Sequence, residues 1–345
     1  MISLFFTNMK MMKLMLLLML FYHSVAESTS VSANANVTIL SVGDWGSAAL
    51  GGYHLKNAQD TANAMQLYLK QYGPSLVLNT GDNFYYCGIQ NGSDPQINED
   101  FVALFGSINV PWYNILGNHD YGFNPDAQIW LNQTIPVWVM DGRYYHRRVV
   151  LRDSGHPIIL NVIALDTNPC VADYRGNDRA KWDPCGLQYP TCEPVPDECR
   201  FHDNIVQQDC SAQLAWFRAV LDSIDADNEW VFVLGHHKAT EINVDNFLEV
   251  LDDARVHVYM NGHTHNLEHY SVNDKPKYMT TGAGGMVIGG HMYDATTINP
   301  TNRSRSIWSK VVTGFTSHKF VGDNTVVTDF WDTHQRILHS FTVSR

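Results

Sequence analysis

Basic residues are scarce in this chain of 345 residues, in which 23 Lys and Arg stand against 35 Asp and Glu and leave a net charge of −12. A phosphate backbone requires basic patches on its partner, so we expect no nucleic acid to bind. An acidic surface also repels small phosphate anions unless cations at a binding site reverse the local field. With 45% hydrophobic residues, the chain is long enough for one large core or for two domains.

A long apolar run is also missing, because the run over residues 14–21 is too short to span a bilayer. It follows two lysines and precedes the small residues Ser24-Val25-Ala26, an order that predicts a secretory signal peptide over residues 1–26. A signal anchor is the alternative, and it is disfavoured because no long apolar run follows. We therefore expect a mature chain, residues 27–345, with no stable membrane anchor.

The C-terminus has neither an apolar tail nor a retention signal. We expect a secreted or lumenal protein, in the extracellular space, the vacuole or the lysosome. Four Asn-x-Ser/Thr sequons agree with secretion and predict acceptors for N-glycans. These sequons begin at Asn36, Asn91, Asn132 and Asn302.

No C-x-x-C pair occurs among the six cysteines, which makes zinc a poor alternative to disulfides. Five of the cysteines fall within 170–210, as in a disulfide-stapled loop. The segment of about 168–210 has no internal hydrophobic repeat, so we expect a Cys-rich surface insert in a single catalytic domain. If all six cysteines are oxidised, one bridge must join Cys87 to the insert and two must lie within it. A free, buried Cys87 is the alternative.

Buried strands and helices alternate through most of the chain, and antiparallel strands follow them. We predict helices over 54–71, 99–105, 212–224 and 245–254. We predict strands over 36–42, 75–80, 110–116, 230–234 and 256–260, a hairpin of 143–151 with 158–165, and antiparallel strands within 270–341.

Five of these strands are followed by residue types that ligate metals. They are Asp44, Asp82 with Tyr85, Asn118 with His119, His236, and His263 with His265. One such residue alone would be a turn or a satisfied polar group, but recurrence after five strands argues against coincidence. Ligands gather at the carboxyl ends of strands in open α/β sheets. Carboxylates and a phenolate suit Fe(III), imidazoles and an amide suit a divalent ion, and the set is large enough for two ions that share a bridging Asp.

The sequence blocks that carry these residues resemble those of a known superfamily. The blocks GDWG (43–46), GDNFY (81–85), GNHD (117–120), GHH (235–237) and GHTH (262–265) match, in this order, the five blocks of the metallophosphoesterases. Tyr85 marks the purple acid phosphatases. The stretches GDNFYYCGI and GNHDYGFNPDAQI look most like the small, single-domain, tartrate-resistant type, and the resemblance covers roughly residues 37–340.

This resemblance implies an α/β fold, a four-layer α-β-β-α sandwich of two mixed β-sheets flanked by helices. It also implies a binuclear centre of Fe(III) and a divalent ion (Fe, Zn or Mn). Carried over block by block, it makes Asp44, Tyr85 and His265 ligands of Fe(III), Asp82 the bridge, Asn118, His236 and His263 ligands of the second ion, and His119 the acid that protonates the leaving alcohol.

The function implied is a secreted acid phosphatase that hydrolyses phosphate monoesters by attack of a metal-bound hydroxide on phosphorus. A phosphodiesterase of the same superfamily and a catalytically idle secreted glycoprotein are the alternatives. In one respect the sequence departs from the pattern. Small family members carry a second His nine residues after the His of the fourth block, and here Asp245 stands at that position.

Overall fold

The computed structural model describes residues 30–32, 37–152, 157–176, 192, 199–287 and 304–345. The predicted signal peptide, the sequons at Asn36 and Asn302, and Cys185 lie outside the described residues. No helix within the described ranges is long and apolar enough to cross a membrane.

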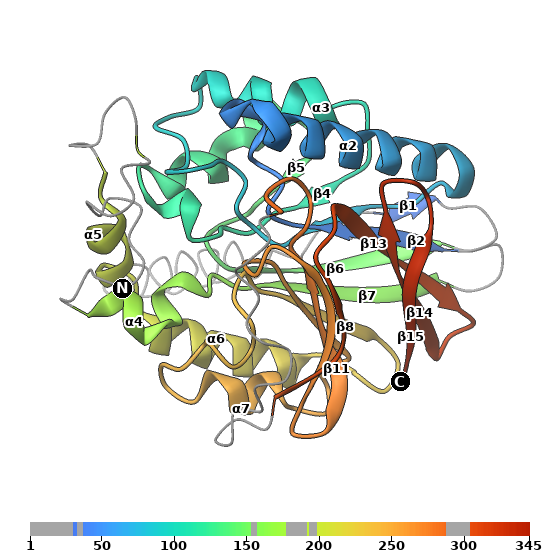
Figure 1. Cartoon of the computed structure of the whole chain (residues 1–345). Helices are drawn as coiled ribbons and strands as arrows, with labels where there is room; N and C mark the ends of the chain where they lie inside the picture. The colour runs from blue at the N-terminus through green and yellow to red at the C-terminus, as the bar shows by residue number, and fades with distance from the viewer. Residues whose placement is uncertain (1–29, 33–36, 153–156, 177–191, 193–198, 288–303) are drawn as a thin grey trace, which may run out of the picture.

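Two mixed β-sheets face each other at the centre of the molecule (Figure 1). The first sheet contains, in spatial order, β15 (Ile337–Ser344), β14 (Thr325–Asp332), β13 (Gly314–Val321), β2 (Thr38–Val42), β3 (Val77–Asn79), β4 (Trp112–Tyr113) and β5 (Trp138–Val139). The second contains β1 (Ser30–Ser32), β6 (Tyr145–Arg152), β7 (Pro157–Ala164), β8 (Trp230–Leu234), β9 (Val258–Asn261), β11 (Lys275–Thr281), β10 (Leu267–Val272) and β12 (Arg305–Lys310).

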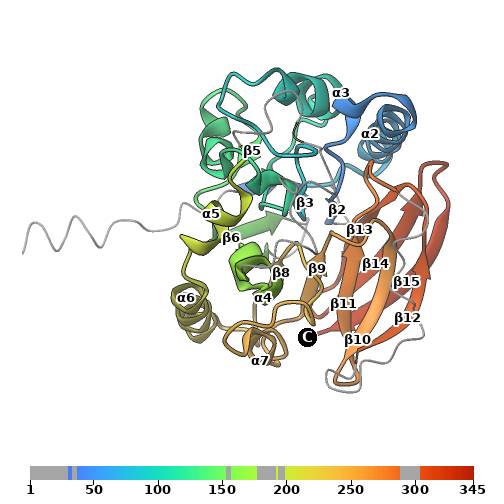
Figure 2. The same cartoon turned by 60° about the vertical axis from the view of Figure 1, so that its left-hand side comes forward.

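Helices cover both outer faces of this pair of sheets, which confirms the predicted α-β-β-α sandwich (Figure 2). The α-helices of the described residues are α2 (Gly52–Tyr72), α3 (Ala103–Phe105) after the π-helical turn η2 (Ile97–Val102), α4 (Ala172–Arg175), α5 (Phe201–Val206), α6 (Cys210–Ser223) and α7 (Phe247–Leu251). The 3-10 helices are η1 (Ala48–Leu50), η3 (His119–Tyr121), η4 (Pro125–Gln133) and η5 (Asn168–Cys170).

Each outer layer has its own apolar contacts. Tyr68 of α2 packs against Phe315 of β13 and Trp331 of β14, with ring centroids 5.8 and 5.4 Å apart. On the opposite face, Phe217 of α6 and Phe247 of α7 stack at 6.0 Å within the cluster that covers β8 and β9. Burial of each large apolar side chain contributes about 1.5–3 kcal/mol, which holds the helices on the sheets.

Strand direction brings the carboxyl ends of five strands to one region. In the first sheet β2, β3 and β4 are parallel neighbours. In the second, β8 runs parallel to β9. The strands β3 and β4 are shorter than the predicted ranges 75–80 and 110–116, because the chain leaves the sheet early there to form the loops described below.

Candidate metal centre

The loops after β2, β3 and β4 of the first sheet meet those after β8 and β9 of the second at the carboxyl ends of these strands. An aromatic cluster packs against the loops after β2 and β3. Trp45 is fully buried, its ring centroid lies 6.0 Å from Phe84 and 6.2 Å from Trp112, and its Nε1 donates to Asn79 Oδ1 at 3.0 Å. The packing of Trp45 therefore fixes the backbone next to Asp44.

Three side chains form what we call the first group: Asp44, Tyr85 and His265. The Tyr85 hydroxyl donates to Asp44 Oδ1 at 3.1 Å and lies 3.2 Å from His265 Nε2. The same Nε2 lies 3.4 Å from Asp44 Oδ1. A phenol oxygen, a carboxylate oxygen and an imidazole nitrogen thus converge on one point, although their residues are up to 221 positions apart in the chain.

Three others form the second group: Asn118, His236 and His263. Asn118 Oδ1 lies 2.7 Å from His236 Nε2 and 2.9 Å from His263 Nδ1. The other nitrogen of His236, Nδ1, donates to the carbonyl oxygen of Thr80 at 2.8 Å. This hydrogen bond sets the tautomer in which the Nε2 lone pair points toward Asn118.

Asp82 lies between the two groups. Its oxygens come within 4.8 Å of ligating atoms of Asp44 and His265, and its Oδ2 lies 3.4 Å from His236 Nε2. Asp82 is fully buried, and among the described residues its Oδ2 has no hydrogen-bond partner. A buried carboxylate oxygen without a donor is costly unless a cation neutralises it, so this atom fits a metal ligand.

Buried charge in the centre has the same implication. Although burial opposes ionisation of Asp82, the charges of His236 and His119 hold the pKa of this carboxyl well below its usual range. Burial likewise opposes charge on His236, but the Asp82 carboxylate raises the pKa of this imidazole to about 9. In its charged form His236 carries a second proton, on Nε2, which it donates to Asn118 Oδ1 at 2.7 Å. A divalent ion bound by these atoms would take the place of that proton.

Backbone strain is concentrated in these loops. Asp44, Asp82, His263 and His265 all have left-handed backbones, with φ of 55°, 54°, 72° and 53°. Each such non-glycine position costs on the order of 1 kcal/mol and is typical of functional sites. This left-handed backbone conformation directs the four side chains toward the centre.

Two glycines of the sequence blocks are explained by close approach. A Cβ at Gly117 would lie 2.1 Å from Asp82 Oδ1, and one at Gly262 would lie 2.3 Å from Asp44 Oδ2. Any side chain at either position would displace a carboxylate from the centre. The recurring glycine before each polar residue is therefore a packing requirement of the site.

His119 borders the centre from the β4 side. Its backbone N–H donates to Asp82 Oδ1 at 2.9 Å, and its Nδ1 donates to the Tyr86 carbonyl oxygen at 2.7 Å. Its Nε2 lies 4.0 Å from Asp82 Oδ2. Burial lowers the pKa of His119 to about 4, although the Asp82 charge opposes this effect.

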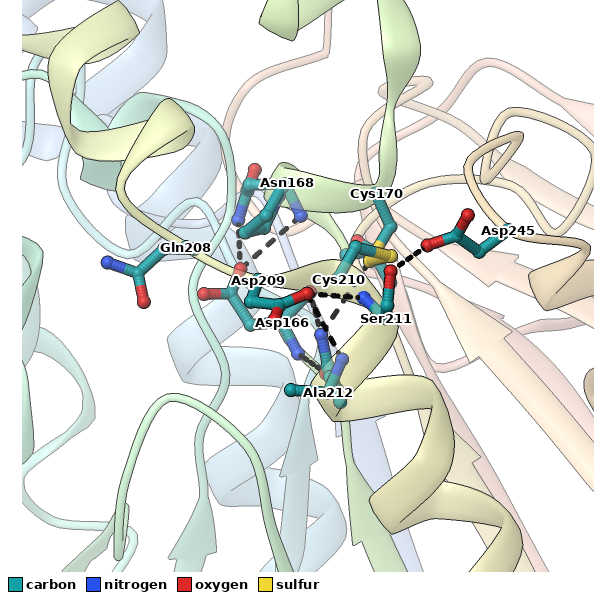
Figure 3. Close-up of a disulfide and its surroundings, with 12 residues drawn as sticks. Asp166, Asn168, Cys170, Gln208, Asp209, Cys210, Ser211, Ala212 and Asp245 are labelled. Atoms are coloured by element: carbon teal, nitrogen blue, oxygen red, sulfur yellow. Dashed lines mark hydrogen bonds between the residues drawn. A yellow bond between two sulfur atoms is a disulfide. The ribbon is translucent and has the colours of Figure 1, made fainter.

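Asp245 is not part of this centre. Its side chain is exposed and accepts a hydrogen bond from the Ser211 hydroxyl at the start of α6, beside a disulfide (Figure 3). Asp209 caps the same helix by accepting from the N–H groups of Ser211 and Ala212. The residue at the offset of the family's second His therefore does not reach the centre.

Two buried histidines near the centre were not identified as site residues from the sequence. His237 lies next to His236 in the chain, and its ring centroid is 4.6 Å from that of His263. The ring of His54 packs at a tilt against Tyr53, with centroids 3.9 Å apart, and its Nδ1 has no hydrogen-bond partner in the described part of the chain. Burial, followed by the charge of His265, lowers the pKa of His54. Nothing in the local sequence distinguishes either residue from an ordinary core histidine.

Two disulfides are formed by described residues. Cys87 is bonded to Cys192, which confirms the predicted link from the Asp82–Tyr85 loop to the insert. Cys170 is bonded to Cys210, which is one of the two bridges predicted within the insert. The remaining predicted bridge involves Cys185, which lies outside the described residues.

Comparison with known proteins agrees with this architecture. Residues 37–267 match the family model of the calcineurin-like phosphoesterases. Purple acid phosphatase 7 of Arabidopsis thaliana is 28% identical over 301 residues, which cover 84% of this chain and 80% of that protein. Tartrate-resistant acid phosphatase type 5 of Oryctolagus cuniculus is 28% identical over 284 residues, covering 79% and 80%.

Solved structures share the fold at lower identity. GAP50, described as the anchor in the inner membrane complex of Plasmodium, aligns with a TM-score of 0.64 at 20% identity and covers 90% of this chain and 89% of its own. Purple acid phosphatase PPD1 from yellow lupin (Lupinus luteus) seeds aligns with a TM-score of 0.54 at 16% identity, covering 93% of this chain and 55% of its own.

Proposed function

The chain belongs to the calcineurin-like phosphoesterase family, and from this premise we propose that it is a binuclear-metal acid phosphatase that hydrolyses phosphate monoesters. The observation that supports the proposal most directly is the pair of ligand groups around Asp82. One group offers a phenol, a carboxylate and an imidazole, whereas the other offers an amide and two imidazoles. Such a division of hard and borderline donors suits two different ions.

In this proposal Asp44, Tyr85, His265 and Asp82 would hold Fe(III). Asn118, His236 and His263, together with Asp82, would hold a divalent ion, Fe(II), Zn(II) or Mn(II). When bound, the two ions would supply Lewis acidity toward the phosphate oxygens and activate a water molecule. They would also reverse the negative field of the two buried aspartates and so admit an anionic substrate.

His119 would deliver the proton to the leaving alcohol in this mechanism. The hydrogen bond from Nδ1 to Tyr86 fixes the ring orientation and directs Nε2 toward the centre. The low pKa of the buried imidazole, about 4, refers to a site without substrate. A phosphate dianion close to the ring favours the imidazolium form and raises this pKa, so the acid is charged when substrate is bound.

We also propose that the protein acts outside the cell or in a lumenal compartment. Two disulfides within the described residues suit an oxidising environment. The sequon residues Asn91 and Asn132 are exposed and therefore accessible to glycosylation. Processing of the signal peptide and glycan attachment are tested together by N-terminal sequencing and glycosidase digestion of the secreted protein.

The central test combines elemental analysis, a visible spectrum and assays of the purified protein. We expect one iron and one further metal ion per chain, a charge-transfer band from the iron-bound phenolate, and faster hydrolysis of p-nitrophenyl phosphate than of bis(p-nitrophenyl) phosphate at acid pH. A preference for the diester, with two divalent ions and no colour, would identify a phosphodiesterase instead.

A second candidate is a binding protein that keeps the fold without catalysis. The exposed position of Asp245 favours it, because the side chain at the offset of the family's second His then does not reach the centre. The name of GAP50 shows that one protein with this fold is described as an anchor. Bound metals without hydrolysis of either substrate would support this candidate and contradict the phosphatase.

A further inference from the structure

We infer that Thr167, His237 and Tyr174 are positioning residues for the second group of ligands, and that the Cys170–Cys210 disulfide holds them in place. The inference rests on the proposed function, because it concerns how tightly the second ion is bound. It assigns a role to part of the insert that neither the sequence blocks nor the ligand set describes.

Thr167 connects the insert to the strand end that carries His236. Its Oγ1 accepts hydrogen bonds from the backbone N–H groups of His236 at 3.1 Å and of His237 at 3.3 Å. It also lies 2.8 Å from His237 Nδ1. One buried hydroxyl thus fixes both the backbone of a proposed ligand and the ring of its neighbour.

His237 completes the connection through its two ring nitrogens. Nδ1 faces the Thr167 hydroxyl, and Nε2 lies 3.0 Å from the Tyr174 hydroxyl. The ring is 1% exposed, and its face packs at a tilt of 52° against His263. Since both nitrogens are engaged by neutral hydroxyls, His237 acts as a neutral wedge that orients His236 through the backbone and His263 by ring contact.

The segment that supplies Thr167 and Tyr174 is itself anchored on three sides. Gln213 of α6 exchanges two hydrogen bonds with the backbone of Asp166, both at 2.8 Å. The Asn168 amide donates to the Leu116 carbonyl oxygen at 3.2 Å, two residues before Asn118. The Cys170–Cys210 bridge then joins η5 covalently to the start of α6 (Figure 3).

The loop that follows β8 closes the same arrangement. The carbonyl oxygen of Cys170 accepts from the N–H groups of Asn243 and Val244, both at 3.1 Å. Asn243 Oδ1 accepts from Ala172 N at the start of α4 at 2.8 Å. The disulfide therefore lies where the insert, α6 and the loop after His236 meet, so that breaking it loosens the segment carrying Thr167 and Tyr174.

The variants Tyr174→Phe and His237→Phe test this inference in the two-metal protein. The first removes only a hydroxyl, and the second keeps a ring but removes both nitrogens. The buried His257, whose Nδ1 accepts from Val231 N at 2.9 Å, offers the matched control His257→Phe remote from the centre. Zn(II) affinity is measured by chelator competition on iron-loaded protein, alongside iron content, the visible band and thermal stability.

We expect both variants to bind Zn(II) about 10–100-fold more weakly, the usual cost of losing an outer-shell contact to a metal ligand, while iron content and colour stay unchanged. The double variant Cys170→Ser/Cys210→Ser should weaken Zn(II) binding in the same direction. The control should lose stability without losing Zn(II) affinity. Unchanged Zn(II) affinity in His237→Phe, or parallel loss of both ions as stability falls, would overturn this inference and leave the proposed function standing. A wild-type protein that binds no second ion would overturn the proposed function as well.

Discussion

The two ligand groups are supported in different ways. Asp44 of the first group lies on the loop after β2, which is held by the Trp45 aromatic cluster and by a buried carboxylate, Asp100, whose Oδ1 accepts from Ala49 N at 2.7 Å. The second group is held by neutral hydroxyls and amides of a disulfide-bonded segment. The first group contains charged or ionisable oxygens, whereas the second contains only neutral donors.

This difference has a physical consequence for metal binding. In the proposed centre, the metal affinity of the first group would come from anionic ligands whose charge is costly to bury, so it would depend on neutralisation by the ion. The metal affinity of the second group would depend on orientation, because neutral imidazole and amide ligands bind well only when their lone pairs converge. Substitutions in the two groups should therefore weaken metal binding for different reasons, loss of charge in the first group and loss of orientation in the second.

The largest effect should come from Asp82→Asn, which changes the one residue proposed to serve both groups. The neutral amide removes the charge that offsets two buried cations, so both ions and all measurable hydrolysis should be lost. Elemental analysis after dialysis measures this. Asp332→Asn is the control, because Asp332 is equally buried but pairs with Arg336 away from the centre. Loss of only one ion would show that Asp82 does not bridge.

His119→Ala should have the next largest effect and should leave both groups intact. We expect kcat to fall about 10²–10⁴-fold, the usual contribution of a general acid, with both ions retained. Substrates with good leaving groups need less protonation and should lose least. Comparison of p-nitrophenyl phosphate with an alkyl phosphate measures the difference. If an ion is lost as well, His119 is a ligand and the comparison of two three-residue groups is wrong.

Tyr85→Phe should separate the two groups spectroscopically. The substitution removes the hydroxyl that contacts Asp44 and His265 but keeps the buried ring, so the visible band should disappear while the second ion stays bound. Tyr86→Phe is the adjacent control and should keep its colour. A colourless wild-type protein containing two zinc ions would contradict the Fe(III) assignment.

The sequence alone indicated which residues the fold brings together at the candidate centre, because most of them follow a buried strand and a glycine that the packing requires. Their role as metal ligands stays a prediction. The sequence also predicted the sandwich and the link between Cys87 and the insert. The outer contacts were not predictable, since Tyr174 reaches His237 across 63 positions and Thr167 reaches it across 70. These pairs are brought together only by the tertiary fold. Asp245 shows the opposite case. Its spacing from His236 matches that of the family's second His, but its side chain contacts Ser211 at the start of α6 instead of the centre.

The smallest effect concerns the support of the first group, through Asp100→Asn. Burial raises the pKa of the Asp100 carboxyl from 3.8 to about 7, although the hydrogen bond from Ala49 opposes the shift. In the described structure its Oδ2 has no hydrogen-bond partner, so ionisation places an uncompensated charge in the core. Asparagine keeps the shape and the acceptor for Ala49 but does not ionise.

The sign of the effect follows from the raised pKa. The folded state holds this proton more tightly than the unfolded state, so the carboxyl stabilises the fold fully below about pH 4. That stability is lost as the pH rises toward 7. Since each pKa unit corresponds to about 1.4 kcal/mol, the wild type should lose about 2–4 kcal/mol of unfolding free energy over this range that Asp100→Asn retains. Urea unfolding of both proteins at about pH 4 and pH 7.5 measures the difference. The contributions of the other titrating groups to the unfolding free energy cancel, because both proteins share these groups.

Parallel pH profiles would show that Asp100 is ionised in the fold. The supports of the two ligand groups would then not differ in their response to pH. Diverging profiles of the wild type and Asp100→Asn would show that the loop supporting the first group is more stable at acid pH.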